Sequence, residues 1–449
     1  MTNSEPQIID VNEQIDAAPI GGLQLAVLGL SLIAMVLEGY DTFTVGYVGP
    51  QIAAAWNVSP SNLGILFTSG IFGSTLGYLG VGPIADHFGR RKLIILGTFA
   101  FGLITLCSVA APSLGSFIAA RVLAGLALGV VLPNVVALVA ELAPLRRRSL
   151  SVVILYSGFA IGAATGGMLS TRLVPTFGWR SVFVVGGIAP MTLSLIMGWA
   201  LPESVRFLAL RDGGDPRLRK TMARIAGPSR IPSDARFILP GEAMSRQPII
   251  RLFRDGRAIS TLLVWLVLAM DGSSIDVLVF WIPTLTARAG VSANAGINFT
   301  VMFLLGGTLG AYAIGYFMDR VGGFRVLVPI HACAAVLVMI FALFIHAASL
   351  PLAFLLGVSL PGGTSGAQGL IARLYPTSLR TTGVGWAVGI GRLTSIVAPV
   401  FTGMLLARGL RPRLIVAAIS IPVAIAAISL LGMSFNAHAR RAVLSSDAA

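Results

Sequence analysis

Two acidic residues stand inside a long apolar stretch near the beginning of the chain. Glu38 and Asp41 lie within the run from Leu25 to Val48, although a charge at the centre of a bilayer costs about 2.5–3.5 kcal/mol on insertion scales. Residues three apart share a face of a helix, so each carboxyl group can raise the other's affinity for a proton. The pattern predicts proton binding by both acids. The alternative is a helix-capping acid that is paired permanently with an arginine.

Two further acids and an arginine occupy similar apolar settings late in the chain. Asp271 and Asp276 lie in one apolar segment and Arg392 in another. An arginine keeps its charge and binds a carboxylate in a planar, two-pronged way, so Arg392 is the candidate site for an organic anion. Its alternative role is a permanent ion pair with an acid such as Asp271. The two acids are candidates for binding further protons, for neutralising Arg392, or for recognising a polar or zwitterionic solute.

Other side chains in the apolar segments are candidate binding residues. Arg121 opens a further apolar segment, where substrate binding and a snorkelling or structural role are both open. Tyr40, next to Asp41, and Trp386, on the segment of Arg392, are the aromatic candidates for binding. Most aromatic residues in membrane proteins pack or anchor at interfaces instead. Aromatic residues available to form the walls of a binding site include Tyr40, Phe43, Tyr156, Phe159, Phe280, Trp281 and Trp386.

The composition places these residues in a membrane protein. Of 449 residues, 55% are hydrophobic and 11% are charged, whereas about 25% of the residues of a soluble domain are charged. The net charge of +14 comes from basic clusters between apolar spans, which indicates contact with membrane lipid and not with nucleic acid. The two cysteines lack a C-x-x-C spacing, so neither a disulfide framework nor a metal site is expected, and no cofactor is expected either.

Apolar segments of roughly 20 residues can cross a bilayer, and the chain has twelve. We expect helices at 22–45, 62–84, 93–111, 116–141, 150–172, 180–201, 259–286, 297–318, 326–347, 351–374, 381–407 and 411–433. The first 18 residues are polar and acidic, unlike a cleavable export signal. Short-loop basic clusters mark the cytoplasmic side. The expected organisation is a cytoplasmic tail at 1–21, a six-helix half at 22–201, a cytoplasmic linker at 202–257, a second six-helix half at 258–433 and a cytoplasmic tail at 434–449.

The two halves carry echoes of one another. The loop sequence from Gly82 to Lys92 has a weaker copy from Gly315 to Arg325, 233 residues later. Other echoes at offsets of 232 or 233 are Pro50 with Pro283, Pro144 with Pro376, and Glu38-Gly39 with Asp271-Gly272. Several echoes at one offset indicate duplication, and duplicated transporter halves predict a binding site near the membrane midplane at their interface.

The loop G-x-x-x-D-x-x-G-R-R resembles the loop between the second and third helices of the major facilitator superfamily. This resemblance implies an all-α integral membrane fold of about twelve helices in two six-helix halves. It also implies that glycines allow close helix contact and that charged side chains bridge helix ends. The candidate gating residues in the loop and its copy are Gly82, Asp86, Gly89, Arg90, Arg91 and Asp319.

Within that superfamily, the chain resembles the aromatic acid:H+ symporter family. Helix one carries the acidic-Gly-aromatic-Asp sequence from Glu38 to Asp41. The matching motifs of helices four and eleven are Arg121 to Gly125, Pro133-Asn134, Glu141, Pro144, Arg146-Arg147-Arg148, Tyr375-Pro376-Thr377, Arg380 and Gly389-Ile390-Gly391-Arg392. Glu141 is expected to form an ion pair beside Arg146, and Arg380 to bridge helix ends, so both are gating candidates.

This resemblance implies a proton-coupled symporter and not an enzyme. It would import a small organic anion, in particular an aromatic carboxylate, by alternating access, as a monomer in the cell's inner (plasma) membrane. Its partners would be that anion, protons and membrane lipid. The alternatives are a facilitator symporter for a non-aromatic organic acid or a sugar acid, and a proton-coupled exporter.

Two departures limit how far the resemblance extends. The acids of helix seven replace an apolar and aromatic run expected in aromatic-acid permeases, which leaves the solute open. Ala163 stands where the antiporter pattern G-x-x-x-G-P-x-x-G-G has proline, which argues against drug export. His331 and His346 are expected near helix ends without acidic neighbours at helical spacing, so neither is assigned to the proton path.

Overall fold

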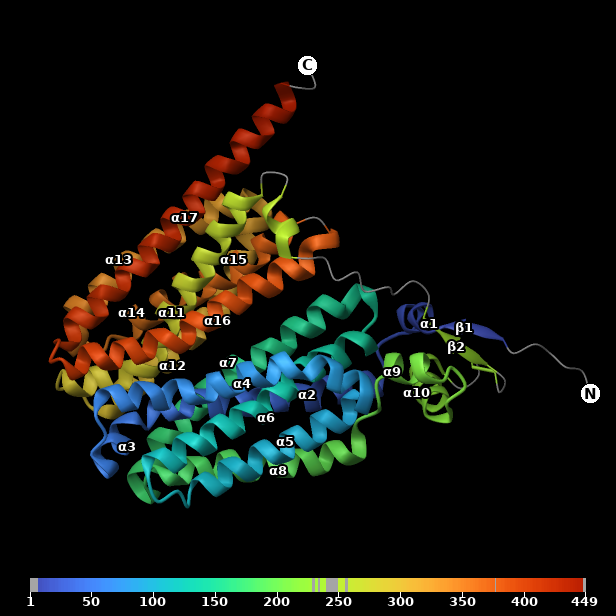
Figure 1. The fold of residues 1–449 in the computed structure, drawn as a ribbon, viewed down its shortest axis with the longest axis horizontal. Coiled ribbons are helices and arrows are strands. Elements are labelled where there is room, and N and C mark those ends of the chain that lie inside the picture. Colours follow the sequence, from blue (N-terminus) through green and yellow to red (C-terminus); the bar gives the residue numbers. More distant parts are fainter. Residues whose placement is uncertain are drawn as a thin grey trace, which may run out of the picture. The chain divides into compact units, whose positions relative to one another are not determined.

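The computed structural model describes residues 7–227, 231–232, 235–239, 249–254, 257–375 and 377–446. Twelve helices in these ranges are long and apolar enough to cross a membrane (Figure 1), which confirms the expected all-α membrane fold. The spans are α2 (Gly22–Tyr47), α4 (Pro60–Phe88), α5 (Arg90–Ser108), α6 (Leu114–Leu142), α7 (Leu145–Phe177), α8 (Arg180–Ala200), α11 (Ala258–Arg288), α12 (Ala293–Val321), α13 (Gly323–Leu343), α14 (Leu350–Ser359) with α15 (Pro361–Leu374), α16 (Thr377–Ala407) and α17 (Pro412–Ser446). The shorter elements are β1 (Ile8–Asp10), α1 (Val11–Ala17), α3 (Gly49–Trp56), α9 (Val205–Arg211), α10 (Pro216–Ala226), β2 (Arg236–Ile238), η2 (Ile249–Phe253) and η3 (Ile345–Ala347).

The tenth span is divided, although one continuous helix is expected from the sequence. Helix α14 ends at Ser359 and α15 begins at Pro361, which stands at the first position of the new helix. Proline lacks the N–H that would continue the hydrogen-bond ladder, whereas a first-turn position needs no such donor. The break therefore lies just before a glycine-rich sequence. Thr364 lies one turn into α15.

The chain divides into two compact units. The first comprises Met1–Thr42, Phe72–Gly162 and Arg180–Met244, and the second comprises Phe43–Ile71, Ala163–Trp179 and Ser245–Ala449. The second unit therefore combines the carboxyl-terminal helices with the end of α2, the start of α4 and the end of α7. Each unit contains its own buried polar residues.

A small substructure in the first unit joins the amino-terminal segment to the segment that follows α8. Strand β1 pairs in parallel with β2, with Ile9 opposite Phe237. The side chains of Ile9, Val11 and Phe237 are buried, together with Met222 of α10, and they belong to one apolar cluster. Burial of this apolar surface holds two segments together that are more than 200 residues apart in the sequence.

Glycines allow α2 and α7 to approach closely inside the first unit. A Cβ atom at Gly39 would lie 1.9 Å from the carbonyl oxygen of Phe159, and one at Gly162 would lie 1.9 Å from that of Val36. Both contacts are with rigid backbone, so the helices would have to separate to admit a side chain. The two glycines thus set the position of the helix that carries Asp41.

We expect Gly39→Ala to destabilise the protein, whereas Gly29→Ala on the same helix should not. A Cβ at Gly29 has no heavy atom within 4 Å, while overpacking of a tight contact costs about 1–3 kcal/mol or more. The measurement is the melting temperature and the yield of monodisperse protein in detergent. Equal stability of the two variants would contradict the close approach of α2 and α7.

Candidate functional site

Asp41 of helix one is paired with Arg121 in the interior of the first unit. Arg121 Nη1 donates a hydrogen bond of 2.8 Å to Asp41 Oδ1, and Nη2 donates to Oδ2. The side chain of Asp41 is 1% exposed and that of Arg121 is 3% exposed, so the pair is shielded from water. A forked, charge-assisted pair of this kind is stronger than a bond between neutral groups, and it joins α2 to α6.

Helix α8 completes the surroundings of this pair. The Arg121 guanidinium lies over the ring of Phe183, 5.7 Å from its centroid, and the Tyr40 hydroxyl donates to the carbonyl of Val182 at 2.7 Å. Arg121 is buried about two turns inside α6, so the snorkelling role considered from the sequence is wrong. That alternative rested on a helix expected to begin at residue 116, whereas α6 begins at Leu114. Glu38, one turn before Asp41 on α2, is also buried.

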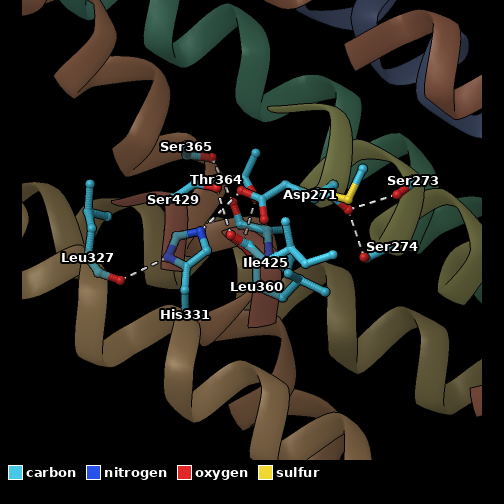
Figure 2. A network of polar contacts seen from close by, with 12 residues as sticks. Asp271, Ser273, Ser274, Leu327, His331, Leu360, Thr364, Ser365, Ile425 and Ser429 are labelled. Atoms are coloured by element: carbon cyan, nitrogen blue, oxygen red, sulfur yellow. Dashed lines mark hydrogen bonds and ion pairs between the residues drawn. The ribbon is translucent and has the colours of Figure 1, made fainter. Parts of the chain in front are cut away.

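A second polar cluster lies inside the second unit and centres on Asp271 (Figure 2). The Nε2 atom of His331 lies 3.1 Å from Asp271 Oδ2, and the hydroxyl of Thr364 lies 3.0 Å from the same oxygen. Asp271 and His331 are both fully buried. Three helices, α11, α13 and α15, therefore meet at one carboxyl oxygen.

His331 is a residue that the sequence argument missed. The sequence predicts it near a helix end and without an acidic partner, whereas the structure places it in the middle of α13. Its partner Asp271 is 60 residues earlier in the chain and on another helix, so helical spacing along α13 carries no sign of it. The only signal available was an ionisable residue inside an apolar segment, which by itself is a reason to expect function.

Asp276 and Arg392 lie together on the facing helices α11 and α16. Asp276 is half-buried and lies beside Arg392 and Ser395. The carboxyl group that neighbours Arg392 is thus Asp276, while Asp271 is engaged by His331 and Thr364. Trp386, six residues before Arg392, stacks on Trp265 of α11 with ring centroids 6.2 Å apart and remains 47% exposed.

Aromatic side chains fill one end of the second unit. Phe280 and Trp281 are fully buried, and the ring of Phe67 lies 5.8 Å from the first and 5.1 Å from the second. The Trp281 indole donates to the carbonyl of Pro399 at 3.1 Å. The packing ties the start of α4 to α11 and α16, at the ends of the helices opposite the basic loops.

The sequence signature of the Major Facilitator Superfamily matches residues 31–399. The chain belongs to this superfamily. The 4-hydroxybenzoate transporter PcaK of Pseudomonas aeruginosa is 32% identical over 435 residues, which cover 96% of this chain and 97% of that protein. The gallate transporter of Pseudomonas putida is also 32% identical and covers 96% of each chain. The crystal structure of a D-xylose-proton symporter superposes with a TM-score of 0.71 at 16% identity, covering 91% of this chain and 97% of that one, and so supports the fold.

These findings confirm a facilitator transporter, closely related to transporters of aromatic acids and not an enzyme. Twelve spans and bacterial relatives of this superfamily make it a multi-pass inner membrane protein. The resemblance read from the motifs of helices one, four and eleven is confirmed at the level of the family. The roles of individual residues in this facilitator remain predictions.

The loop motif of the facilitator joins the ends of neighbouring helices through Arg90 and Arg91. Arg90 pairs with Glu141 at 2.6 Å, and the backbone N–H of Arg91 donates to Glu203 at 3.0 Å. Gly89 has a φ of +85°, a conformation that other residues rarely adopt. The prediction that Glu141 pairs with Arg146 is wrong. Arg146 lies beyond the end of α6 and donates to the carbonyl of Ala18.

Other gating candidates of the facilitator are less well defined. Asp319 lies on an exposed part of α12 near its end. The side chains of Asp86 and Arg380 and the surroundings of Gly82 lie outside the described part of the structure. Their bridging roles therefore stay predictions from the sequence.

Proposed function

We propose that this transporter imports an aromatic carboxylate together with protons by alternating access. The observation that carries the proposal is the buried forked pair of Asp41 and Arg121. Its charges cancel only while Asp41 is ionised, so a proton on Asp41 releases a buried guanidinium that then favours an anion. The names of the relatives, transporters of 4-hydroxybenzoate and of gallate, support an aromatic carboxylate as that anion.

In this proposal, Arg392 binds the substrate carboxylate. Its planar guanidinium can donate two parallel hydrogen bonds to a carboxylate, and Asp276 beside it would neutralise the cation between transport events. Trp386 on the same helix offers an exposed aromatic face to the ring of the substrate. Arg121 is the alternative cation for the anion, and it becomes available once Asp41 is protonated.

Alternating access also needs contacts that hold helix ends and then release them. We assign this role to the pairs of Arg90 with Glu141 and of Arg91 with Glu203, which join helix ends on the side of the basic loops. The excess of short-loop cations makes that side cytoplasmic. The linker between the halves and both termini are cytoplasmic in this orientation.

The experiment is uptake of labelled solutes into cells that express the transporter, with and without a protonophore. The panel consists of 4-hydroxybenzoate, benzoate, 3-hydroxyphenylpropionate and one sugar acid. We expect the aromatic acids to accumulate and the protonophore to abolish that accumulation. Uptake of the sugar acid alone would favour the alternative substrate class, and accumulation that survives the protonophore would contradict proton coupling.

A further inference from the structure

The contact between Asp271 and His331 requires one proton more than an ionised aspartate and a neutral histidine carry together. The Nδ1 atom of His331 lies 2.9 Å from the carbonyl oxygen of Leu327. A carbonyl oxygen only accepts, so Nδ1 carries a hydrogen. The other ring nitrogen, Nε2, faces the carboxyl oxygen Oδ2 of Asp271 (Figure 2).

A hydrogen must also lie between Nε2 and Oδ2. If the Asp271 carboxyl is ionised, Nε2 has to donate and His331 is an imidazolium. If the imidazole is neutral, its Nε2 has only a lone pair, so the carboxyl has to donate. Both arrangements contain the same single proton across the gap, and in both the pair has no net charge.

While Nδ1 keeps its hydrogen against the Leu327 carbonyl, loss of the shared proton breaks the contact between the helices, and the other tautomer would keep that contact only by leaving the carbonyl facing a lone pair. Two lone pairs would then face one another across 3.1 Å, and a full negative charge would remain on Asp271. Its other oxygen, Oδ1, is buried and has no hydrogen-bond partner among the described residues. Burial of an unpaired charge is costly, so proton binding and the joining of α11, α13 and α15 are coupled.

The surroundings offer little charge to compensate for that loss. The groups around the pair in Figure 2 are hydroxyls, those of Ser365, Ser429, Ser273 and Ser274, which donate to backbone carbonyls. From α12, Ile314 and Met318 contribute apolar surface next to Leu327. From α16, the cation is Arg392, and it lies beside Asp276. A Cβ at Gly363 of α15 would lie 2.9 Å from the imidazole, so the glycine leaves room for the ring.

We propose that Asp271 and His331 bind a second transported proton, in addition to the one on Asp41. This proposal rests on the proposed function and adds its stoichiometry. The proton enters the gap between Nε2 and Oδ2 as the three helices join and leaves it as they separate. Two protons then enter with each monoanion, so one positive charge moves inward in each cycle.

The experiment measures uptake by wild-type and variant transporter in vesicles under an inward proton gradient, with and without an inside-negative potential. We expect the potential to increase uptake by the wild type. The double variant Asp271→Asn/His331→Gln keeps a neutral hydrogen-bonding pair that can neither gain nor lose a proton. It should retain uptake driven by the proton gradient and lose the response to potential. The control is His346→Gln, because exposed His346 makes a similar Nδ1–carbonyl contact, to Ala289, and should keep the wild-type response.

Two results would overturn the second proton site, namely a wild type that is indifferent to potential and a double variant that still responds. If the double variant does not transport, the exchanged variant Asp271→His/His331→Asp decides. Return of potential-driven uptake in the exchanged variant supports a shared proton, and failure to return contradicts it.

A measurement without substrate separates this inference from the proposed function. Nitrogen-15 spectra of histidine-labelled protein, compared with those of His331→Gln, report the hydrogen at Nε2. We expect the wild-type spectra to show one hydrogen between Nε2 and Asp271, held on either atom, and Asp271→Asn to lose it. Wild-type spectra in which His331 is neutral with a free Nε2, or spectra that Asp271→Asn leaves unchanged, would overturn the proton site, whatever the panel of acids shows.

Discussion

Replacing Asp41 with asparagine should abolish accumulation of substrate against its gradient. The amide has the shape of the carboxylic acid but cannot exchange a proton, so the event that releases and recaptures Arg121 no longer occurs. Exchange of labelled for unlabelled substrate across the membrane should continue, since it needs no net proton movement. The measurement compares concentrative uptake with exchange in vesicles that contain equal amounts of transporter.

The stability of this variant needs its own control. Removing one partner of a buried ion pair costs about 3–5 kcal/mol, because the other charge is left uncompensated. The double variant Asp41→Asn/Arg121→Gln removes both charges and should recover much of the lost stability without recovering accumulation. Wild-type accumulation by Asp41→Asn would show that the proton is carried elsewhere, in the first place on Glu38.

Arg392→Lys should weaken binding of the substrate strongly while the charge is kept. A lysine presents one ammonium group and cannot make two parallel bonds to a carboxylate. Loss of one hydrogen bond to a charged group costs about 1.5–3 kcal/mol, which corresponds to roughly a 10- to 150-fold rise in the dissociation constant. The measurement is the concentration of substrate at half-maximal exchange.

Arg408→Lys is the matched control for this substitution. Arg408 is exposed and lies just after the end of α16, the helix that contains Arg392, so the same change there should leave apparent affinity unaltered. An unchanged affinity in Arg392→Lys itself would move the anion site to Arg121. In that event Arg121→Lys should produce the loss of affinity instead.

The elements that the sequence predicts well are those that depend on local composition. Twelve apolar segments of the right length are visible because each must span the bilayer by itself. The functional importance of Asp41 is predicted in the same way, because an acidic residue inside an apolar helix is costly and generally has a function. Its partner does not follow, because several arginines were available and only the packing of α2 against α6 selects Arg121.

Contacts between distant helices could not be predicted in this way. Asp271 and His331 are on different helices. In addition, the sequence predicts a start at residue 326 for the helix that begins at Gly323. This difference of three residues places His331 nearer to a helix end than it is. Proximity in the sequence predicts Arg146 as the partner of Glu141. The structure assigns it Arg90, because α5 packs along α6 whereas Arg146 follows the turn at Pro144.

The parallel pairing of β1 with β2 has a practical consequence for handling the protein. Ile9 and Val11 are 6% and 0% exposed, so a deletion that reached them would uncover Phe237 and the apolar face of α10 to water. An affinity tag or fluorescent fusion at the amino terminus would therefore have to leave residues from Ile8 onward intact. No described residue of α17 (Pro412–Ser446) belongs to the apolar cluster that includes Ile9 and Val11, so the carboxyl terminus is the safer attachment point for purification and imaging.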